Sequence, residues 1–128
     1  MPYGEFLATV RERGGYAPDE AERSTEAVVG ALGRRLPAGA AEHLGEQLPQ
    51  RLAELLGDAQ ARAETWGVHE FVAHVAEASG TDEPTAEEHS RTVLSTLADR
   101  ISGGELNKVL GRLPSGYAEL FGHPELSE

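Results

Sequence analysis

Apolar residues recur at helical spacing along almost the whole chain, and no stretch alternates strictly between apolar and polar positions. This pattern is typical of amphipathic α-helices that each bury one face. The first helix is predicted from about Tyr3 to Arg13 and should stop at Gly14-Gly15, because glycine adopts the left-handed conformation of a helix C-cap without strain. A longer helix is predicted to begin near Pro18-Asp19. The pattern therefore predicts an all-α fold.

The same pattern occurs twice, without a gap, at an offset of 65 residues. Leu48-Pro49 and the Ala-Glu-Leu-Leu-Gly that follows return as Leu113-Pro114 and Ala-Glu-Leu-Phe-Gly. A period of this length indicates a duplicated structural unit. One unit of about 55 residues would bury only about 60% of its surface and be marginal alone, so we expect both units to share one core. The expected single domain comprises repeat one (3–57), a connection (58–67), repeat two (68–122) and a frayed tail (123–128).

Each repeat should form four helices, of which only the second is long. An approximate twofold axis should relate the two repeats. In repeat two the four helices begin with one from 68 to 79 that stops at Gly80, followed by a long helix from about Pro84 to Ile101. Thr85 and Glu88 have the spacing of a capping box, as do Ser102 and Glu105. The last helix of each repeat should open after Leu-Pro and end at a glycine, Gly57 or Gly122. The connection should be partly helical, with Trp66 buried against one or both repeats.

The net charge of −11, from 22 acidic and 11 basic residues, narrows the possible partners. So acidic a surface repels nucleic acid and anionic membranes, and we expect neither as a partner. The absence of cysteine excludes disulfides, thiolate metal sites and thiol catalysis. No segment has the apolar length of an export signal or a membrane span, so we expect a cytoplasmic protein.

Several motifs together resemble a known bacterial family. These are Gly-Glu-Phe-Leu at 4–7, His-Glu-Phe-Val at 69–72, Ser-Gly-Gly-Glu-Leu at 102–106, and the Leu-Pro and Ala-Glu-Leu-Phe-Gly segments that close repeat two. Over residues 3 to 122 the chain is similar to the family called domain of unknown function 2267. Repeat one departs from it at Pro37-Ala38-Gly39-Ala40, where the Gly-Gly-Glu signature is replaced. The resemblance implies a small, all-helical, duplicated protein and brings no activity, cofactor or catalytic residue.

Histidine and carboxylate side chains provide the only candidate metal site. Glu70 and His74 lie four residues apart on one helix face, and His89 lies in the first turn of the long helix expected nearby. A glutamate and two histidines could hold zinc or iron. However, the Glu-x-x-His spacing of helical di-iron proteins is absent, so we predict no metal and no other cofactor.

The remaining charged residues suggest structure rather than catalysis. Acidic residues that occur in both repeats are expected in ion pairs, because a catalytic pair needs to exist only once. We predict that Arg35 pairs with Glu54 and that Arg100 pairs with Glu119. No serine has a histidine at a useful spacing, and no glycine-rich loop has the form of a phosphate-binding loop. The sequence therefore contains no catalytic residue that we can name, and it disfavours an enzyme.

Two classes of function remain. The first is a protein-interaction or adaptor module that binds an unidentified protein or a second copy of itself. The second is a small-ligand or metal-binding protein with a site in a groove between the repeats. Under the first hypothesis, aromatic or basic residues that occur in one repeat only are candidate contacts. These are Tyr16, Trp66, Lys108 and Tyr117. Tyr16 and Trp66 are expected to share one interaction face, although each of the four also has a structural explanation as core or solvated surface.

Overall fold

The computed structural model describes residues 2–58 and 64–126, and α-helices make up most of that part of the chain. The helices are α1 (Tyr3–Gly14), α2 (Pro18–Arg35), α3 (Ala38–Gly45), α4 (Gln50–Asp58), α5 (Val68–Ser79), α6 (Glu83–Ala98), α7 (Gly103–Leu110) and α8 (Tyr117–Leu120). A 3₁₀-helix, η1, follows at Pro124–Leu126. The described residues contain no β-strand, so the predicted all-α fold is confirmed.

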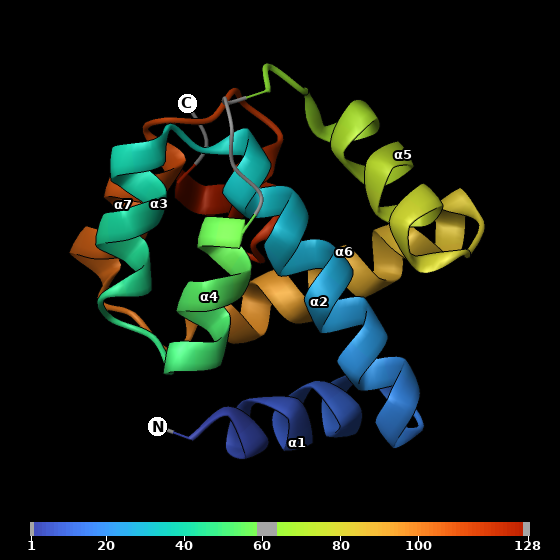
Figure 1. The fold of residues 1–128 in the computed structure, drawn as a ribbon. Coiled ribbons are helices and arrows are strands. Elements are labelled where there is room, and N and C mark those ends of the chain that lie inside the picture. Colours follow the sequence, from blue (N-terminus) through green and yellow to red (C-terminus); the bar gives the residue numbers. More distant parts are fainter. Residues whose placement is uncertain (1, 59–63, 127–128) are drawn as a thin grey trace.

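The long helix α2 lies at the centre of the molecule and contacts α1, α3, α4, α5 and α6 (Figure 1). Its buried residues are Ala21, Ser24, Thr25, Val28, Val29, Ala31 and Leu32. A set this broad covers more than one face because other helices pack on several sides of α2. The charges at both ends of α2 interact favourably with the helix dipole: Asp19 and Glu20 lie in the first turn, and Arg34 and Arg35 lie in the last turn.

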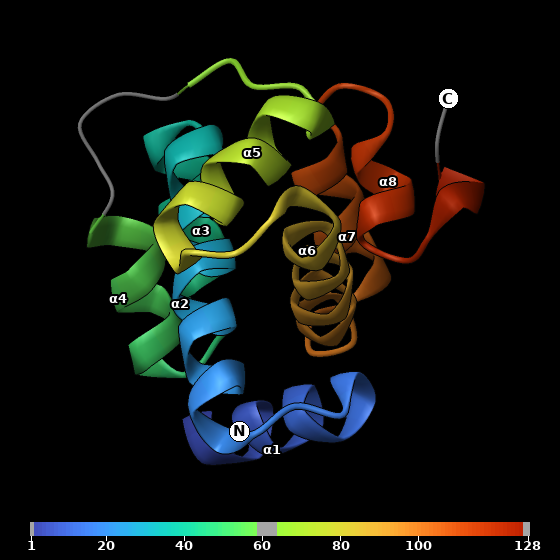
Figure 2. The same cartoon turned by 90° about the vertical axis from the view of Figure 1, so that its right-hand side faces the viewer.

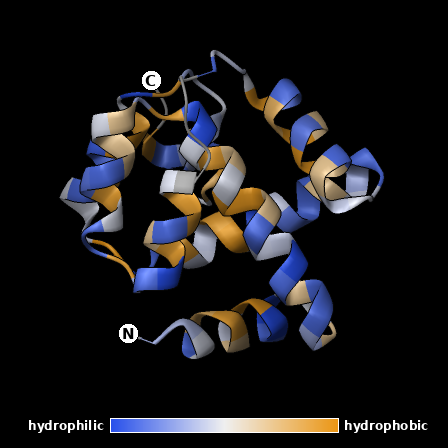
Figure 3. Cartoon of the chain, viewed as in Figure 1, coloured by the Kyte–Doolittle hydropathy of each residue, from blue (hydrophilic) through white to orange (hydrophobic). Residues whose placement is uncertain are grey.

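Helices α1 and α5 lie across opposite ends of the central pair α2 and α6 (Figure 2). Each of them contacts both α2 and α6, whereas α4 packs between α2 and α3, and α3 also touches α7. The hydrophobic side of α1 faces the other helices (Figure 3). One continuous cluster of buried residues includes Phe6, Leu32, Phe71 and Leu97, so both halves of the chain contribute to one core. The division into two duplicated repeats stays a prediction.

The helix caps in the structure agree with the sequence predictions at some helix ends and differ at others. The glycine caps after α1 and α5 are confirmed, because Gly15 and Gly80 have φ angles of 70° and 72°. Helix α6 begins earlier than the predicted capping box, since the Asp82 side chain accepts a hydrogen bond of 2.9 Å from the Thr85 amide. It also ends at Ala98, before Ile101. The cap before α7 is as predicted, with Ser102 accepting from the Glu105 amide.

The two short helices after Leu-Pro differ in length. Helix α4 continues through Gly57, where we predicted its end, whereas α8 is only 4 residues long. At the offset of 65 residues, Gly116 corresponds to Arg51. The φ angle of Gly116 is 102°, which is not helical, so α8 begins only at Tyr117. The predicted stop at Gly122 is confirmed by its φ of 84°.

The tail is more ordered than the sequence suggested, whereas the described part of the connection lacks the predicted helix. Residues 64–67 are not helical, and the rest of the predicted partly helical connection lies outside the described residues, apart from the end of α4. Trp66 is partly buried against the core. The tail forms η1, and Leu126 packs on the core, so the predicted fraying is wrong for 124–126. Apolar contact by Leu126 explains the difference.

Candidate functional site

Trp66 fixes the connection to both halves of the molecule. Its indole ring stacks on the imidazole of His74 in α5, with 4.5 Å between centroids. The Arg34 guanidinium of α2 lies 5.6 Å from the indole centroid and pairs with Glu64 at 3.0 Å. Burial, followed by the charge of Arg34, lowers the pKa of His74. Trp66 was predicted to be buried against one or both repeats, and it is partly buried, in contact with α2 and α5.

The backbone carbonyl of Trp66 receives two further hydrogen bonds. Arg35 donates from Nε at 2.6 Å, and the Tyr117 hydroxyl donates at 3.0 Å. Tyr117 is fully buried, and this burial raises the pKa of its hydroxyl to about 12. Tyr117 is therefore part of the core and cannot contact a partner. The predicted pairing of Arg35 with Glu54 is wrong, because the guanidinium faces the connection and the Tyr117 ring.

Arg100 and Glu119 do not form the second predicted pair. The Arg100 guanidinium donates to Thr9 Oγ1 at 2.9 Å, since α1 crosses the end of α6. Glu119 is exposed on the short helix α8 and has no ion-pair partner among residues 2–58 and 64–126. Glu54 instead lies 3.6 Å from Arg51 on its own helix. These arginines hold elements together without the predicted carboxylates.

Tyr16 is a buried contact between helices, so its predicted place on an interaction face is wrong. Its exposed fraction is 9%, and its hydroxyl lies 3.2 Å from Thr92 Oγ1 of α6. The ring meets His89 edge-on at 5.0 Å. It also lies directly over Gly14, where a Cβ would be 2.2 Å from the ring. The missing side chain of Gly14 therefore makes room for the tyrosine.

Tyr16 and Trp66 also lie too far apart to form one face. Tyr16 precedes the first residue of α2, whereas Trp66 contacts Arg34 and Arg35 at the other end of that helix. A helix rises about 1.5 Å per residue, so the 18 residues of α2 separate these positions by about 27 Å.

The three candidate metal ligands have separate roles. Glu70 accepts a hydrogen bond from the Gly67 amide at 2.9 Å and so caps α5. His74 stacks on Trp66. His89 is buried and its Nε2 lies 3.0 Å from a carboxylate oxygen of Glu20. In the described part of the chain, no three His, Asp or Glu side chains come together in a way that could hold a metal ion.

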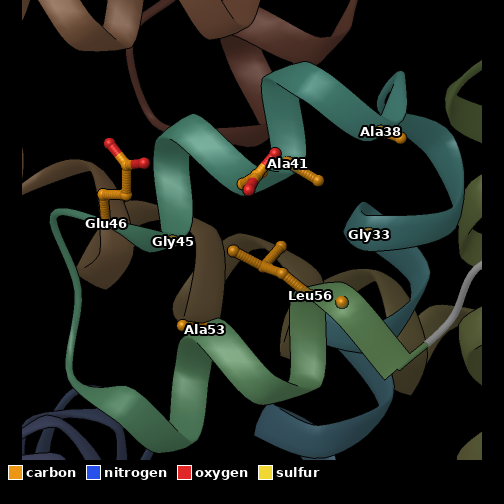
Figure 4. A pocket seen from close by; sticks show the side chains of 9 residues that line it. Gly33, Ala38, Ala41, Gly45, Glu46, Ala53 and Leu56 are labelled. Atoms are coloured by element: carbon orange, nitrogen blue, oxygen red, sulfur yellow. The ribbon is translucent and has the colours of Figure 1, made fainter.

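A groove of about 520 Å³ lies between α3 and α4, and we call it the α3–α4 groove (Figure 4). Most of the residues that line it have a small side chain or none. They are Gly33, Ala38, Ala41, Glu42, Gly45, Glu46, Ala53, Leu56 and Gly57. Leu56 points from α4 into the space between the helices (Figure 4). The groove exists because these positions lack larger side chains.

Acidic residues form the rim of the α3–α4 groove. Glu42 and Glu46 are both exposed: Glu42 lies on α3, and Glu46 directly follows the last residue of that helix. Glu42 has no ion-pair partner in the part of the chain that the structure describes, and Glu46 has only a long contact of 3.9 Å with His43. The rim therefore carries two carboxylates that are largely free to attract a cation. The sequence signal for this groove was the run of small residues on one face of α3, which we did not interpret.

A second groove, of about 320 Å³, lies between α3 and α7, and we call it the α3–α7 groove. It separates an element of predicted repeat one from an element of predicted repeat two. Its lining residues are Gly39, Ala40, His43, Leu44, Glu105, Lys108, Val109, Gly111 and Arg112. Lys108 is the one sequence-predicted contact residue that is fully accessible, with a side chain 69% exposed.

Glu105 links the two walls of the α3–α7 groove. Its Oε1 lies 3.0 Å from His43 Nε2 and accepts from Gln47 Nε2 at 3.1 Å. Its Oε2 lies 3.7 Å from the Lys108 ammonium. The hydrogen bond from Gln47 is the main cause of a lowered pKa of this carboxyl, with smaller contributions from Lys108 and His43. Glu105 is thus a stable anion that ties α7 to α3.

The chain matches the model of a protein family over most of its length. Residues 3–120 match the family described as "Uncharacterized conserved protein (DUF2267)". No curated protein sequence matches the chain. Among the described residues, no helix combines the length and the apolar character needed to cross a membrane.

Proposed function

The chain belongs to the DUF2267 family, and because that family's description carries no activity, we propose from the geometry that the protein is a non-enzymatic interaction module. Its docking site is the α3–α4 groove, and its partner is a protein that presents a basic amphipathic helix. The observation that carries this proposal is a groove lined by small residues and flanked by exposed carboxylates.

The shape of the α3–α4 groove suits the side chains of a helix. Ala38, Ala41 and Gly45 occupy one face of α3, and Ala53 and Gly57 face them from α4. Walls without large side chains let a partner's apolar residues reach down to Leu56. Amphipathic helices bind grooves in this way, with anchor residues three or four positions apart. Each buried leucine or similar anchor would contribute roughly 1.5–3 kcal/mol before the losses of association.

Charge determines which helix fits. Glu42 and Glu46 lie on the rim, and the whole chain carries a net charge of −11. Lysine or arginine beside the partner's apolar anchors would therefore be attracted both at a distance and in contact. An acidic helix, or a second copy of this acidic chain, would be repelled. The rim thus favours a basic protein partner over self-association.

The test is selection of helical peptides by the purified full-length protein from a displayed random library. We expect enriched peptides with apolar residues at helical spacing flanked by lysine or arginine. The affinity of the best peptide is then measured by fluorescence polarisation on two variants that fill the groove, Ala38→Leu and Gly57→Leu. Both positions are exposed, so the fold should tolerate them. The matched control is Ala8→Leu, at an exposed position on α1.

We expect each groove variant to weaken binding at least tenfold, with Ala8→Leu close to wild type. Glu42→Gln should weaken binding several-fold, compared with Glu12→Gln, which removes an exposed carboxylate on α1. Enriched peptides that bind both leucine variants as well as wild type would refute the α3–α4 groove as the site. Analytical ultracentrifugation that finds a dimer, which Gly57→Leu dissociates, would replace the partner helix by a second copy.

A further inference from the structure

We propose that the α3–α7 groove is a separate binding site for a small organic anion, with one carboxylate and a compact apolar body. This inference does not rest on the proposed partner helix, because the two grooves lie on different sides of α3. Residues 38, 41, 42 and 45 line one groove, and residues 39, 40, 43 and 44 line the other.

The positive charge of the groove is the first argument. Lys108, the only lysine of the chain, lies on α7, and Arg112 lies in the turn that follows this helix; both line the groove. Within the described residues, the Arg112 side chain has no ion-pair or hydrogen-bond partner, and the contact of Lys108 with Glu105 is long at 3.7 Å. Two available cations beside one groove are unusual on a chain with a net charge of −11.

The carboxylate of Glu105 limits the negative charge that a ligand in the α3–α7 groove can carry. Its carboxylate is already held by His43 and Gln47, so it offsets one of the two cations at that end. A net charge of about one positive unit then remains among the groove's charged side chains, Glu105, Lys108 and Arg112. A carboxylate carries a single charge and matches this balance. A doubly charged phosphate would be repelled by Glu105 and by the acidic body.

The apolar lining and the volume define the rest of the ligand. Leu44 and Val109, with exposed fractions of 1% and 6%, form the floor together with Ala40. Small-molecule sites are commonly concave, mostly apolar and about 300–1,000 Å³ in volume, with a few polar groups that fix orientation. At about 320 Å³, the α3–α7 groove suits a small ligand such as an arylalkyl carboxylate.

The experiment titrates the full chain with 3-phenylpropionate and follows the Leu44 and Val109 methyl resonances by NMR. The matched probe is 3-phenylpropionamide, which has the same shape without the charge. We expect saturable shifts at both methyl groups with the carboxylate only. In the Lys108→Gln/Arg112→Gln variant the dissociation constant should rise at least tenfold. The control Arg91→Gln removes an arginine on α6 that pairs with Glu87, and it should bind like wild type.

Three results would overturn the inference. These are shifts that do not saturate, equal binding of the amide, or an unchanged dissociation constant in the double glutamine variant. Gly57→Leu separates the two proposals, because it fills the α3–α4 groove and should leave binding of 3-phenylpropionate unchanged. The peptide experiment and the carboxylate experiment can therefore fail independently.

Discussion

Replacement of Gly33 by alanine should destabilise the protein, although alanine is the better helix former. Gly33 lies where α2 crosses α4, and a Cβ at this position would be 2.1 Å from the Leu56 carbonyl oxygen. The obstructing atoms belong to the backbone, so they cannot rotate away. Helix α4 would have to retreat by roughly 1 Å before that separation reached even 3.0 Å.

The size of the effect follows from two opposing terms. Overpacking of a core costs about 1–3 kcal/mol, and the upper value applies here because a whole helix must move. The retreat would also loosen the packing of Leu52 and Leu56, which are 0% and 2% exposed. Alanine returns about 1 kcal/mol through its helix propensity. We therefore expect Gly33→Ala to lower the free energy of unfolding by about 2 kcal/mol.

Gly30→Ala is the matched control, because it lies one turn earlier on the same helix. A Cβ there would have nothing within 4 Å, so only the propensity term remains. We expect Gly30→Ala to raise the free energy of unfolding by about 0.5–1 kcal/mol. The assay is urea unfolding followed by far-UV circular dichroism. If Gly33→Ala proved as stable as wild type, with an unchanged dependence on urea, the close approach of α2 and α4 would be refuted.

Three further predictions concern caps and titrating groups. Asp82→Ala removes the N-cap of α6 and should lower the free energy of unfolding by about 1 kcal/mol in a urea titration. Thr85→Ala keeps the backbone amide that donates to the Asp82 side chain, so it should lower this free energy by less. Equal losses in the two variants would contradict the assignment of Asp82 as the cap. The pKa of Tyr117 is raised to about 12, so its contribution to stability is complete below the ordinary value of about 10 and lost as the pH rises toward 12. Between pH 9 and pH 11, wild type should therefore lose about 1.4 kcal/mol more than Tyr117→Phe, and parallel losses would refute the burial of the hydroxyl. The pKa of His74 is lowered, so its contribution is present above the ordinary value of about 6.5 and is lost as the pH falls below it. Thermal unfolding followed by Trp66 fluorescence should then show a smaller acid-induced loss for His74→Gln than for wild type, and an equal loss would count against the stacked geometry.

Features determined by neighbours in the chain were predictable from the sequence. The stops at Gly15 and Gly80 need only a glycine after an amphipathic helix, so they were placed to the residue. The start of α6 was predicted at about Pro84 and lies at Glu83, but the cap was assigned to Thr85 instead of Asp82, because both have suitable spacing. Helix existence thus followed from periodicity, whereas helix boundaries depended on which of two similar caps is used.

Features determined by three-dimensional crossing were not predictable in the same way. Arg35 was assigned to Glu54 because charge suggested a carboxylate, but its nearest acceptor is a carbonyl from the connection. Tyr16 was expected on an interaction face because it occurs in one repeat only, but its ring packs over Gly14 and against Thr92 and His89 of α6. The grooves beside α3 were missed for a different reason. They are formed by absent side chains, and a pattern of large apolar residues does not show them.

The two hydrogen bonds to the backbone carbonyl of Trp66 affect which residues can be substituted as the sequence diverges in evolution. Arg35 and Tyr117 donate to the carbonyl oxygen of residue 66, and every amino acid supplies that oxygen. A mutation at position 66 can remove the indole and leave both hydrogen bonds in place. A substitution that removes the Arg35 or Tyr117 donor also removes its hydrogen bond, because no other residue would donate to the carbonyl oxygen in its place. In diverging lineages we therefore expect the tryptophan to be exchanged earlier than the arginine or the tyrosine.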